Sequence, residues 1–427
     1  MNTPKLYELF LQSSIICTDT RNISRNCMFV ALKGNNFNGN DFAIQALEQG
    51  AKYVIVDKDL NSNSNKIILV KDTLKTLQEL ANYHRKQLKT TIIALTGSNG
   101  KTTTKELLSA VLSTQYKTVS TFGNLNNHIG VPLTLLSIKK DTEIAIVEMG
   151  ANHQKEIEIL CHIAEPDFGL ITNFGKAHLE GFGGIEGVIK GKSELYDHLK
   201  KHNKFIFVNE DDTLQIKQTK GYKNTISFGS KSDSNADLEL LTSQPLISVN
   251  YKGTTVNSNL AGHYNFNNIA IAIAVGTYFK IDKNHIISAI ENYLPTNNRS
   301  QIIELNGNKI LMDAYNANPT SMMAALENFK QISHPDKVLF LGDMFELGND
   351  APKEHQAIVN YLENNPVEQV FLLGENFSKT KVSKSFIQQY ASFQDLNSQF
   401  NKNDLKNKFI LIKGSRGMAL ERLLDII

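Results

Sequence analysis

Short apolar runs alternate with stretches of helical periodicity along most of the chain. The runs are rich in Val, Ile, Leu and Phe and contain few polar residues, which is typical of strands buried on both faces of a parallel sheet. Their positions predict strands at residues 53–56, 67–70, 92–95, 144–147, 168–172, 205–208, 310–312, 338–341, 370–373 and 409–412. Strands that alternate with helices indicate an α/β fold with parallel sheets.

The pattern changes between residues 238 and 259, where short segments alternate between apolar and polar positions. Within this region, Asn250-Tyr251-Lys252-Gly253 has the composition of a hairpin turn. We therefore predict a small antiparallel excursion that ends before Gly262.

Two changes of composition divide the chain into three predicted domains, at residues 1–88, 89–297 and 298–427. The first is the polar region 83–90, and the second is Leu294-Pro295-Thr296-Asn297-Asn298, where a proline and polar residues interrupt a helical pattern.

The last third repeats a strand followed by a glycine, at Leu341-Gly342, Leu373-Gly374 and Lys413-Gly414. This repeat predicts a Rossmann-like, doubly wound sheet whose ligands approach the carboxyl ends of the strands.

The segment Thr96-Gly97-Ser98-Asn99-Gly100-Lys101-Thr102-Thr103 lies between a predicted strand and a helix-prone stretch, as a phosphate-binding loop does. Its glycines let backbone N–H groups approach phosphates, its lysine can reach the β- and γ-phosphates, and Thr102 can hold Mg²⁺. The generic pattern requires a glycine where this chain has Leu95, so the match is to a shorter T-G-x-N-G-K-T form. The alternative is a Gly-Lys turn that binds nothing. The flanking strand and helix favour a site for a nucleoside triphosphate.

Three polar residues of the middle third are further candidates. Glu148 ends the strand at 144–147, where its carboxylate would project toward the phosphate loop and favour Mg²⁺. Asn173 and His178 follow the next strand, although a lone histidine there is more often a surface or capping residue. Spacing alone gives Lys192 no role beyond that of a solvated helix lysine.

Composition limits the remaining possibilities. The chain of 427 residues has 45 basic and 43 acidic residues and a net charge of +2, which argues against nucleic acid as a partner. No apolar segment is long enough to span a bilayer and no signal peptide is evident, so we expect a cytoplasmic protein. The cysteines at 17, 27 and 161 lack metal-ligand spacing and are expected to be reduced.

These motifs together resemble the Mur ligase family, the ATP-dependent enzymes that form amide bonds in the peptide stem of peptidoglycan. The resemblance covers essentially the whole chain. Three blocks are similar to the family member that adds D-alanyl-D-alanine to UDP-N-acetylmuramoyl-tripeptide: Tyr315-Asn316-Ala317-Asn318-Pro319, Gly342-Asp343-Met344-Phe345-Glu346-Leu347-Gly348 and Lys413-Gly414-Ser415-Arg416-Gly417-Met418. The D-N-P-R block of the sibling that adds a diamino acid is absent.

The resemblance implies a role for individual residues. ATP would be bound by Gly97, Ser98, Asn99, Gly100, Lys101, Thr102, Thr103, Asn268, Arg299 and Asp313. Mg²⁺ would be held by Thr102, Glu148, His178 and Lys192, with Lys192 carbamylated by CO₂. The catalytic residues would be Lys101, Lys192 and His178, and the substrates would contact Thr20, Arg21, Asn126, Asn127, Asn316, Asn318 and Arg416.

The implied first domain grips the UDP of the substrate, the central domain binds ATP, and the third closes over the nucleotide and binds the dipeptide. The implied reaction passes through an acyl phosphate, and a monomer is expected. The base that deprotonates the incoming amine stays unassigned, because a metal-bound imidazole at His178 could not accept the proton.

Three other functions remain open. A ligase that adds glutamate to folate would share the loop and the metal scheme but would not need the first domain. A noncatalytic scaffold would keep the fold without turnover. A P-loop kinase or GTPase would account for the loop but not for the last third of the chain.

Overall fold

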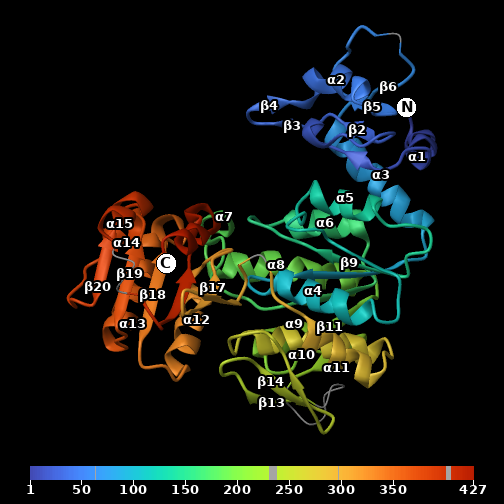
Figure 1. The fold of residues 1–427 in the computed structure, drawn as a ribbon. Helices are drawn as coiled ribbons and strands as arrows, with labels where there is room; N and C mark the ends of the chain where they lie inside the picture. The colour runs from blue at the N-terminus through green and yellow to red at the C-terminus, as the bar shows by residue number, and fades with distance from the viewer. Residues whose placement is uncertain (63, 230–237, 297, 401–404) are drawn as a thin grey trace.

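Three sheets that are wholly or mostly parallel follow one another along the chain, and each is built from a separate stretch of sequence (Figure 1). The computed structural model describes residues 1–62, 64–229, 238–296, 298–400 and 405–427. The N-terminal and the C-terminal sheets lie on different sides of the central one, and the small antiparallel sheet lies at the end of the central part far from the N-terminal sheet (Figure 1). The fold is therefore α/β, as the alternation of strands and helices predicts.

The N-terminal sheet has the strand order β1-β2-β5-β6, with all neighbours parallel. Met28, Val30 and Ile55 face the helices α1 and α3, whereas Phe29 and Val54 face α2. The elements are α1 (Thr3–Leu11), β1 (Ile16–Cys17), the 3₁₀ helix η1 (Thr20–Asn22), β2 (Met28–Val30), β3 (Lys33–Gly34), β4 (Phe37–Asn38), η2 (Gly39–Phe42), α2 (Ala43–Glu48), β5 (Tyr53–Val56), β6 (Ile67–Leu69) and α3 (Thr73–Gln87).

The helix α3 leads from the N-terminal sheet to the central part and packs against α5 and α6 there. Asp72 caps its first turn by accepting a hydrogen bond from the backbone N–H of Lys75 at 2.8 Å. Basic side chains occupy its last turn, where the helix dipole favours them. The polar region 83–90 is thus the end of this helix and the short connection to β7.

The central sheet is entirely parallel, in the order β12-β11-β10-β7-β9-β8. Side chains of β7 alternate: Ile93 and Leu95 face α4, α10 and α11, and Ile92 and Ala94 face the opposite cluster that includes α5, α6 and α8. The elements are β7 (Thr91–Thr96), α4 (Lys101–Leu112), β8 (Thr118–Ser120), α5 (Gly130–Leu136), β9 (Ile144–Glu148), α6 (Glu156–Ala164), β10 (Phe168–Ile171), α7 (Leu179–Phe182), α8 (Ile185–Lys201), β11 (Phe205–Asn209), α9 (Thr213–Thr219), β12 (Thr225–Phe228), α10 (Asn265–Tyr278) and α11 (Lys283–Asn292).

The antiparallel excursion predicted between 238 and 259 is present. It consists of β13 (Leu238–Thr242), β14 (Ser248–Tyr251) and β15 (Thr254–Asn257), each paired antiparallel with the next. The turn between β14 and β15 is Lys252-Gly253, and both residues have positive φ, at 48° and 75°. A two-residue turn with positive φ at both positions matches the twist of a hairpin, which explains the glycine.

The third sheet has the order β16-β17-β21-β18-β19-β20; β16 is antiparallel to β17, and the other neighbours are parallel. Leu339 and Leu341 of β18 face α12 and α13, and Val338 and Phe340 face the opposite side. The elements are β16 (Gln301–Leu305), β17 (Asn308–Asp313), α12 (Pro319–Gln331), β18 (Lys337–Gly342), η3 (Gly348–Asp350), α13 (Ala351–Asn364), β19 (Gln369–Leu373), α14 (Glu375–Ser378), β20 (Ile387–Tyr390), α15 (Phe393–Gln399), β21 (Phe409–Lys413), η5 (Arg416–Met418) and η6 (Leu420–Asp425).

All ten predicted strands are confirmed, and no strand end lies more than two residues from its predicted position. The predicted boundary at 297 lies outside the described residues, and Leu294 to Thr296 and Asn298 lie between α11 and β16. Within the described ranges, no helix combines the length and the apolar character needed to cross a membrane.

A charged cluster ties α3 to the edge of the central sheet. Asp167 accepts hydrogen bonds from Arg85 of α3 and from Lys204, each at 2.7 Å, and from the backbone N–H of Ile92 at 3.0 Å. Arg85 also donates to the carbonyl oxygens of Thr90 and Ala164. Because one carboxylate thereby fixes the starts of β7, β10 and β11 against α3, it sets where the central sheet begins.

We expect Asp167→Asn to lower the free energy of unfolding by about 2 kcal/mol, since it leaves Arg85 and Lys204 partly buried without their anion. The chain contains no tryptophan, so urea unfolding should be followed by far-UV circular dichroism. Asp141→Asn removes the exposed pair with Lys117 and is the matched control, with an expected change below about 0.5 kcal/mol. Equal effects of the two substitutions would contradict this role of Asp167.

Candidate functional site

A cavity of about 910 Å³ lies between the central sheet and the third sheet. Its walls come from the loop between β7 and α4, the end of β9, the loop after β10 and the start of α10. The third part contributes residues 313–318 after β17, the first turns of α12, and Phe345 and Glu346 after β18. The carboxyl ends of parallel strands from two sheets therefore face one cavity.

The loop from Gly97 to Gly100 has the conformation of a phosphate-binding loop. Gly97 and Gly100 have φ values of +148° and +79°, and a Cβ atom on Gly97 would lie 1.9 Å from Oγ1 of Thr172. A residue with a side chain at position 97 would therefore be strained by the positive φ and would clash with Thr172. The helix α4 starts directly after the loop, so the N–H groups of its first turn have no acceptor within the helix and point toward the cavity.

Asn99 connects the loop to both sheets. Its backbone N–H donates to Oδ1 of Asn173 at 3.0 Å, and its carbonyl oxygen accepts from Thr172 Oγ1 at 2.6 Å and from Asn173 Nδ2 at 3.0 Å. Its side-chain oxygen accepts a hydrogen bond of 2.7 Å from Nδ2 of Asn318. Asn318 is also the N-cap of α12 in a capping box with Ser321, so the third part is anchored at the phosphate loop.

Lys101 lies at the start of α4 with its side chain folded over the loop. Its amino group donates to the carbonyl oxygen of Gly97 at 2.7 Å. Burial lowers the pKa of this amino group, an effect that Glu148 opposes and Arg299 reinforces. Within the described part of the chain, this amino group donates to the carbonyl oxygens of Gly97 and Ser98, and it remains near enough to the loop to bind an incoming phosphate.

Glu148 and Thr102 are adjacent at the base of the cavity. The Thr102 hydroxyl donates to the Glu148 carboxylate at 3.0 Å, and Nδ2 of Asn126 donates to the same carboxylate at 2.8 Å. Glu148 is only 1% exposed and is the last residue of β9, as predicted. Asn127 also lines the cavity, and its side chain accepts hydrogen bonds from the N–H groups of Ile129 and Gly130.

The loop after β10 meets the third part through two ion pairs. Nδ1 of His178 lies against Oε2 of Glu346, and the histidine holds the pKa of that carboxyl below its usual range. Lys176 donates to Glu354 at 2.6 Å, on a side of the loop that does not line the cavity. His178 lines the cavity at the start of α7, and its partner Glu346 comes from the third part, which spacing did not reveal.

Lys192 is 1% exposed and lies behind the cavity wall on α8. Its amino group donates to the carbonyl oxygen of Ala151 at 3.1 Å and lies 5.0 Å from the ring centroid of Phe182. Burial, with the positive charge of Lys101 as a second cause, holds the pKa of this amino group well below its usual range. The interpretation as a solvated helix lysine, which spacing alone gave, is wrong because α7 and α6 cover it.

Arg299 and Asp313 line the cavity. Arg299 lies in the connection before β16, and Asp313 is the last residue of β17. The Arg299 guanidinium stacks on Tyr315, with 3.6 Å between its Cζ atom and the centre of the ring. Its buried Nε atom has no hydrogen-bond partner within the described protein. An orphaned donor in a cavity is a signal for a ligand. Asp313 accepts from Lys413 at 2.5 Å and from the N–H of Ser300 at 3.3 Å.

Asn268 lies buried beneath the phosphate loop. Its Nδ2 donates to Asn265 at 2.7 Å, and its Oδ1 accepts from the Thr104 hydroxyl at 3.0 Å. A Cβ atom on Gly100 would approach this side chain to 2.5 Å. The asparagine therefore packs against the loop and still lines the cavity.

Five predicted site residues do not line this cavity: Thr20, Arg21, Gly97, Lys192 and Arg416. Arg21 is on the N-terminal part and forms a bidentate pair with Asp19, with contacts of 2.5–3.0 Å. Arg416 is paired with Glu421 at 3.1 Å. Asn316 lines the cavity beside Asn318, and its side chain accepts from the N–H of Ala317.

Sequence reasoning did not single out Tyr315, Phe345, Glu346 or Lys413 as site residues. All four line the cavity. Each lies inside one of the three blocks that carry the family resemblance, so position in a block was the available signal.

The chain matches three family models in succession. They are described as "Mur ligase family, catalytic domain" over residues 12–85, "Mur ligase middle domain" over 95–276 and "Mur ligase, glutamate ligase domain" over 298–416.

Relatives and solved structures match over nearly the whole chain. A protein of Bacillus subtilis named UDP-N-acetylmuramoyl-tripeptide--D-alanyl-D-alanine ligase is 36% identical to this chain over an alignment of 433 positions. The alignment covers 96% of this chain and 93% of that protein. A structure of MurF from Acinetobacter baumannii has a TM-score of 0.87 and 29% identity, with 99% and 98% of the two chains covered. MurF ligase from Thermotoga maritima in complex with ADP has a TM-score of 0.83 and 28% identity, with 98% and 97% covered. The chain therefore belongs to the Mur ligase family.

Proposed function

We propose that this chain is an ATP-dependent ligase that joins D-alanyl-D-alanine to UDP-N-acetylmuramoyl-tripeptide and releases ADP and phosphate. The observation that carries the proposal is the shared cavity, in which Asn318 of the third part bonds to Asn99 of the phosphate loop. A kinase or GTPase needs the loop but not a second sheet closed upon it. The named function of the Bacillus subtilis relative, which is similar along the whole chain, supports the choice of substrates.

The first chemical step would phosphorylate the terminal carboxylate of the tripeptide. A carboxylate oxygen forms a bond to the γ-phosphorus of ATP, the bond to the β–γ bridging oxygen breaks, and ADP leaves. Catalysis of such a transfer is mostly positioning and charge stabilisation. Lys101, the N-terminus of α4 and Arg299 supply positive charge at the cavity, and the orphaned Nε of Arg299 supports a phosphate contact.

Thr102 and Glu148 fit a Mg²⁺ ion that accompanies ATP. They offer a hydroxyl and a carboxylate oxygen 3.0 Å apart beside the loop, and hard oxygen ligands suit this metal. Among the residues that the structure describes, no group of three His, Cys, Asp or Glu side chains is arranged to hold a metal. Few protein ligands are the usual case for Mg²⁺ bound with phosphates. Bound there, the ion would neutralise charge on the transferred phosphoryl group.

Lys192 and His178 would complete the surroundings of this ion, as the family resemblance implies. Carbamylation needs a neutral amine, because the nitrogen lone pair attacks CO₂ and a proton is released. The strongly lowered pKa of Lys192 supports that requirement. His178 faces the cavity but contacts Glu346, so it would have to change partner to serve as a ligand.

In the second step the amine of the dipeptide attacks the acyl carbon and forms the amide bond. The bond between the acyl carbon and the phosphate oxygen breaks, and phosphate leaves with that oxygen. The positive groups that served the first step also face the oxyanion that forms here. Closure of the third part over the loop excludes water that would hydrolyse the acyl phosphate. The base for the amine proton stays unassigned.

We further propose that Asn268 contacts the adenine, Asp313 the ribose, and Thr20 and Arg21 the UDP of the substrate. Asn126, Asn127, Asn316, Asn318 and Arg416 would contact the peptide substrates. Residues 1–88, 89–297 and 298–427 would form the UDP-binding, ATP-binding and closing domains. Because Arg21 is exposed, its guanidinium is accessible to a diphosphate, for which its planar fork is suited.

The proposal predicts that phosphate release from ATP requires both substrates. It should be measured with UDP-N-acetylmuramoyl-tripeptide alone, with added D-alanyl-D-alanine and with added free D-alanine. We expect sustained release only with the dipeptide, and a product heavier by that dipeptide less water. Release that depends on a different amino acid would refute the assigned acceptor, and no release with any acceptor would favour a scaffold.

Lys101→Ala should reduce phosphate release by about 100-fold or more, because charge stabilisation at the loop is lost. Binding of the UDP substrate, measured by calorimetry, should change by less than about threefold, since Arg21 lies on another part of the chain. Lys155→Ala, an exposed lysine of the central part, is the control and should affect neither quantity. Joint loss of both quantities would contradict the separation of the two sites.

Lys192→Ala should also reduce turnover by about 100-fold, and added formate, acetate or propionate should restore part of it. A small acid can occupy the space of the missing carbamate and supply its negative charge. Lys101→Ala serves as the control, because an anion cannot replace its cation. Near-normal turnover of Lys192→Ala would show that no carbamate is needed.

A further inference from the structure

Five carboxylates line the cavity, and they differ in how many hydrogen bonds they already accept from the protein: Glu148, Glu156, Asp212, Asp313 and Glu346. Glu148 accepts from Thr102 and Asn126, and Glu156 accepts from the N–H groups of Asn152 and His153. Asp212 caps α9, and Asp313 is bound by Lys413. Each of these four carboxylates has a hydrogen-bonded partner within the protein, and Glu148 and Asp313 already have proposed roles at the metal and the ribose.

Glu346 differs from the others in its exposure and its partner. Its side chain is 54% exposed, and among the described residues its carboxylate contacts the imidazole of His178. It belongs to the third part, which would bind the acceptor dipeptide. Its neighbour Phe345 is an aromatic side chain that is 42% exposed and also lines the cavity.

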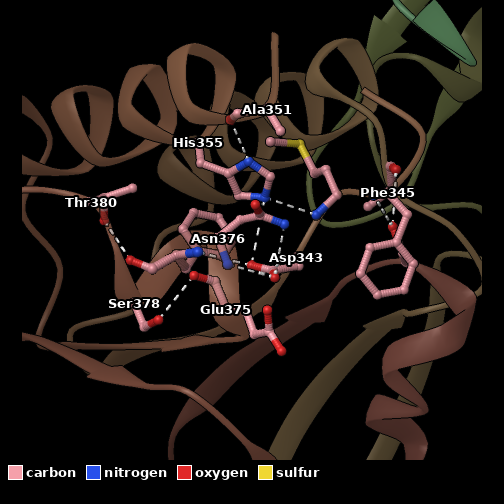
Figure 2. Close-up of polar contacts among 12 residues, drawn as sticks. Asp343, Phe345, Ala351, His355, Glu375, Asn376, Ser378 and Thr380 are labelled. Carbon is pink, nitrogen blue, oxygen red and sulfur yellow. Dashed lines mark hydrogen bonds and ion pairs between the residues drawn. The ribbon is translucent and has the colours of Figure 1, made fainter. Parts of the chain in front are cut away.

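Hydrogen bonds fix the backbone just before Glu346, and Figure 2 shows those around Asp343 and His355. Asp343 accepts from the N–H groups of Asn376 and Phe377 at 2.8 and 2.9 Å. Nε2 of His355 accepts from the N–H of Met344 at 3.0 Å, so Nδ1 carries the proton and donates to the Ala351 carbonyl oxygen at 2.7 Å.

The next residue is fixed as well. The N–H of Phe345 donates to the Ser415 hydroxyl at 2.9 Å (Figure 2), and the Phe345 ring lies over Gly417, where a Cβ atom would meet it at 2.8 Å. Glu346 follows with a φ of +61°, a conformation that residues other than glycine rarely adopt. The turn thus presents one apolar side chain, Phe345, and one anionic side chain, Glu346, to the cavity.

We propose that Glu346 binds the ammonium group of the acceptor dipeptide and that Phe345 contacts its first methyl group. This inference rests on the proposed function, since it names how that acceptor is held. A charged carboxylate is the natural partner of an ammonium ion, and an aromatic face suits a small apolar group. Glu346 is then a binding residue of the acceptor site.

The contact with His178 leaves the carboxylate able to bind the acceptor. Only Oε2 of Glu346 lies against the imidazole, and a carboxylate has two oxygens that can each accept hydrogen bonds. An ammonium group at Oε1 would share the carboxylate with His178, so one side chain would link the acceptor to the loop after β10.

The test is the kinetics of Glu346→Gln in the full chain. We expect the KM for D-alanyl-D-alanine to rise about tenfold or more, and the KM values for ATP and for the UDP substrate to change by less than about twofold. N-propanoyl-D-alanine, which lacks only the ammonium group, should inhibit wild type and variant with equal inhibition constants. Its binding also reports that the cavity of the variant is intact.

Glu354→Gln is the matched control, because it removes the other ion pair between the same two parts, outside the cavity lining. If the two variants change the same constants equally, Glu346 holds the parts together and the proposal is overturned. An unchanged KM for the dipeptide in Glu346→Gln overturns it, as does weaker binding of N-propanoyl-D-alanine.

A partial reaction separates this inference from the proposed function. Wild type should form ADP in a single turnover with ATP and the UDP substrate before any acceptor is added, and Glu346→Gln should do so equally well. If wild type forms no ADP, the proposed function itself fails. If ADP forms but the KM for the dipeptide is insensitive to Glu346, only the acceptor site is wrong.

Discussion

The hydrogen bond between Asn99 and Asn318 is the contact on which the site depends. A phosphate loop on a parallel sheet binds a nucleotide at one edge of that sheet, and by itself it leaves the opposite side of the nucleotide to solvent. Asn99 turns its backbone toward Asn173 and Thr172 of its own sheet and its side chain toward Asn318. The same asparagine that shapes the loop therefore places the third sheet over it.

The contact also explains why the capping of α12 matters for chemistry. Asn318 caps the helix with its Oδ1 atom and reaches the loop with its Nδ2 atom, so one side chain orients both. The ion pairs of Lys176 and His178 lie on the neighbouring loop after β10 and reach α13 and the turn after β18. These contacts are polar, as is common at interfaces between domains of one chain.

Much of the fold could be predicted from the sequence, and the reason is the burial of the strands. Parallel strands covered on both faces appear as uninterrupted apolar runs, and residues 92–95 or 409–412 are of this kind. The strands that escaped prediction are short or lie at the edges of sheets. The strand β8 at Thr118–Ser120 is half-buried, and the exposed hairpin of β3 and β4 has no apolar run.

The site was predictable only where local sequence sets the geometry. Gly97, Gly100 and Lys101 form a contiguous loop, and Glu148 ends a strand, so their places followed from the pattern. Lys192 could not be placed in that way, because its burial depends on α6 and α7 packing over α8. Glu346 could not be predicted for a similar reason. Its contact with His178 joins two loops that follow strands of different sheets.

In the proposed reaction, this cavity activates a carboxylate by transferring the γ-phosphoryl group of ATP to it. The most direct test uses UDP-N-acetylmuramoyl-tripeptide labelled with ¹⁸O in its terminal carboxylate, and mass analysis of the phosphate released as the amide forms. We expect one ¹⁸O atom in each phosphate, because the carboxylate oxygen leaves with phosphorus when the amine attacks. Phosphate without label would show that water cleaves ATP and that no carboxylate is phosphorylated.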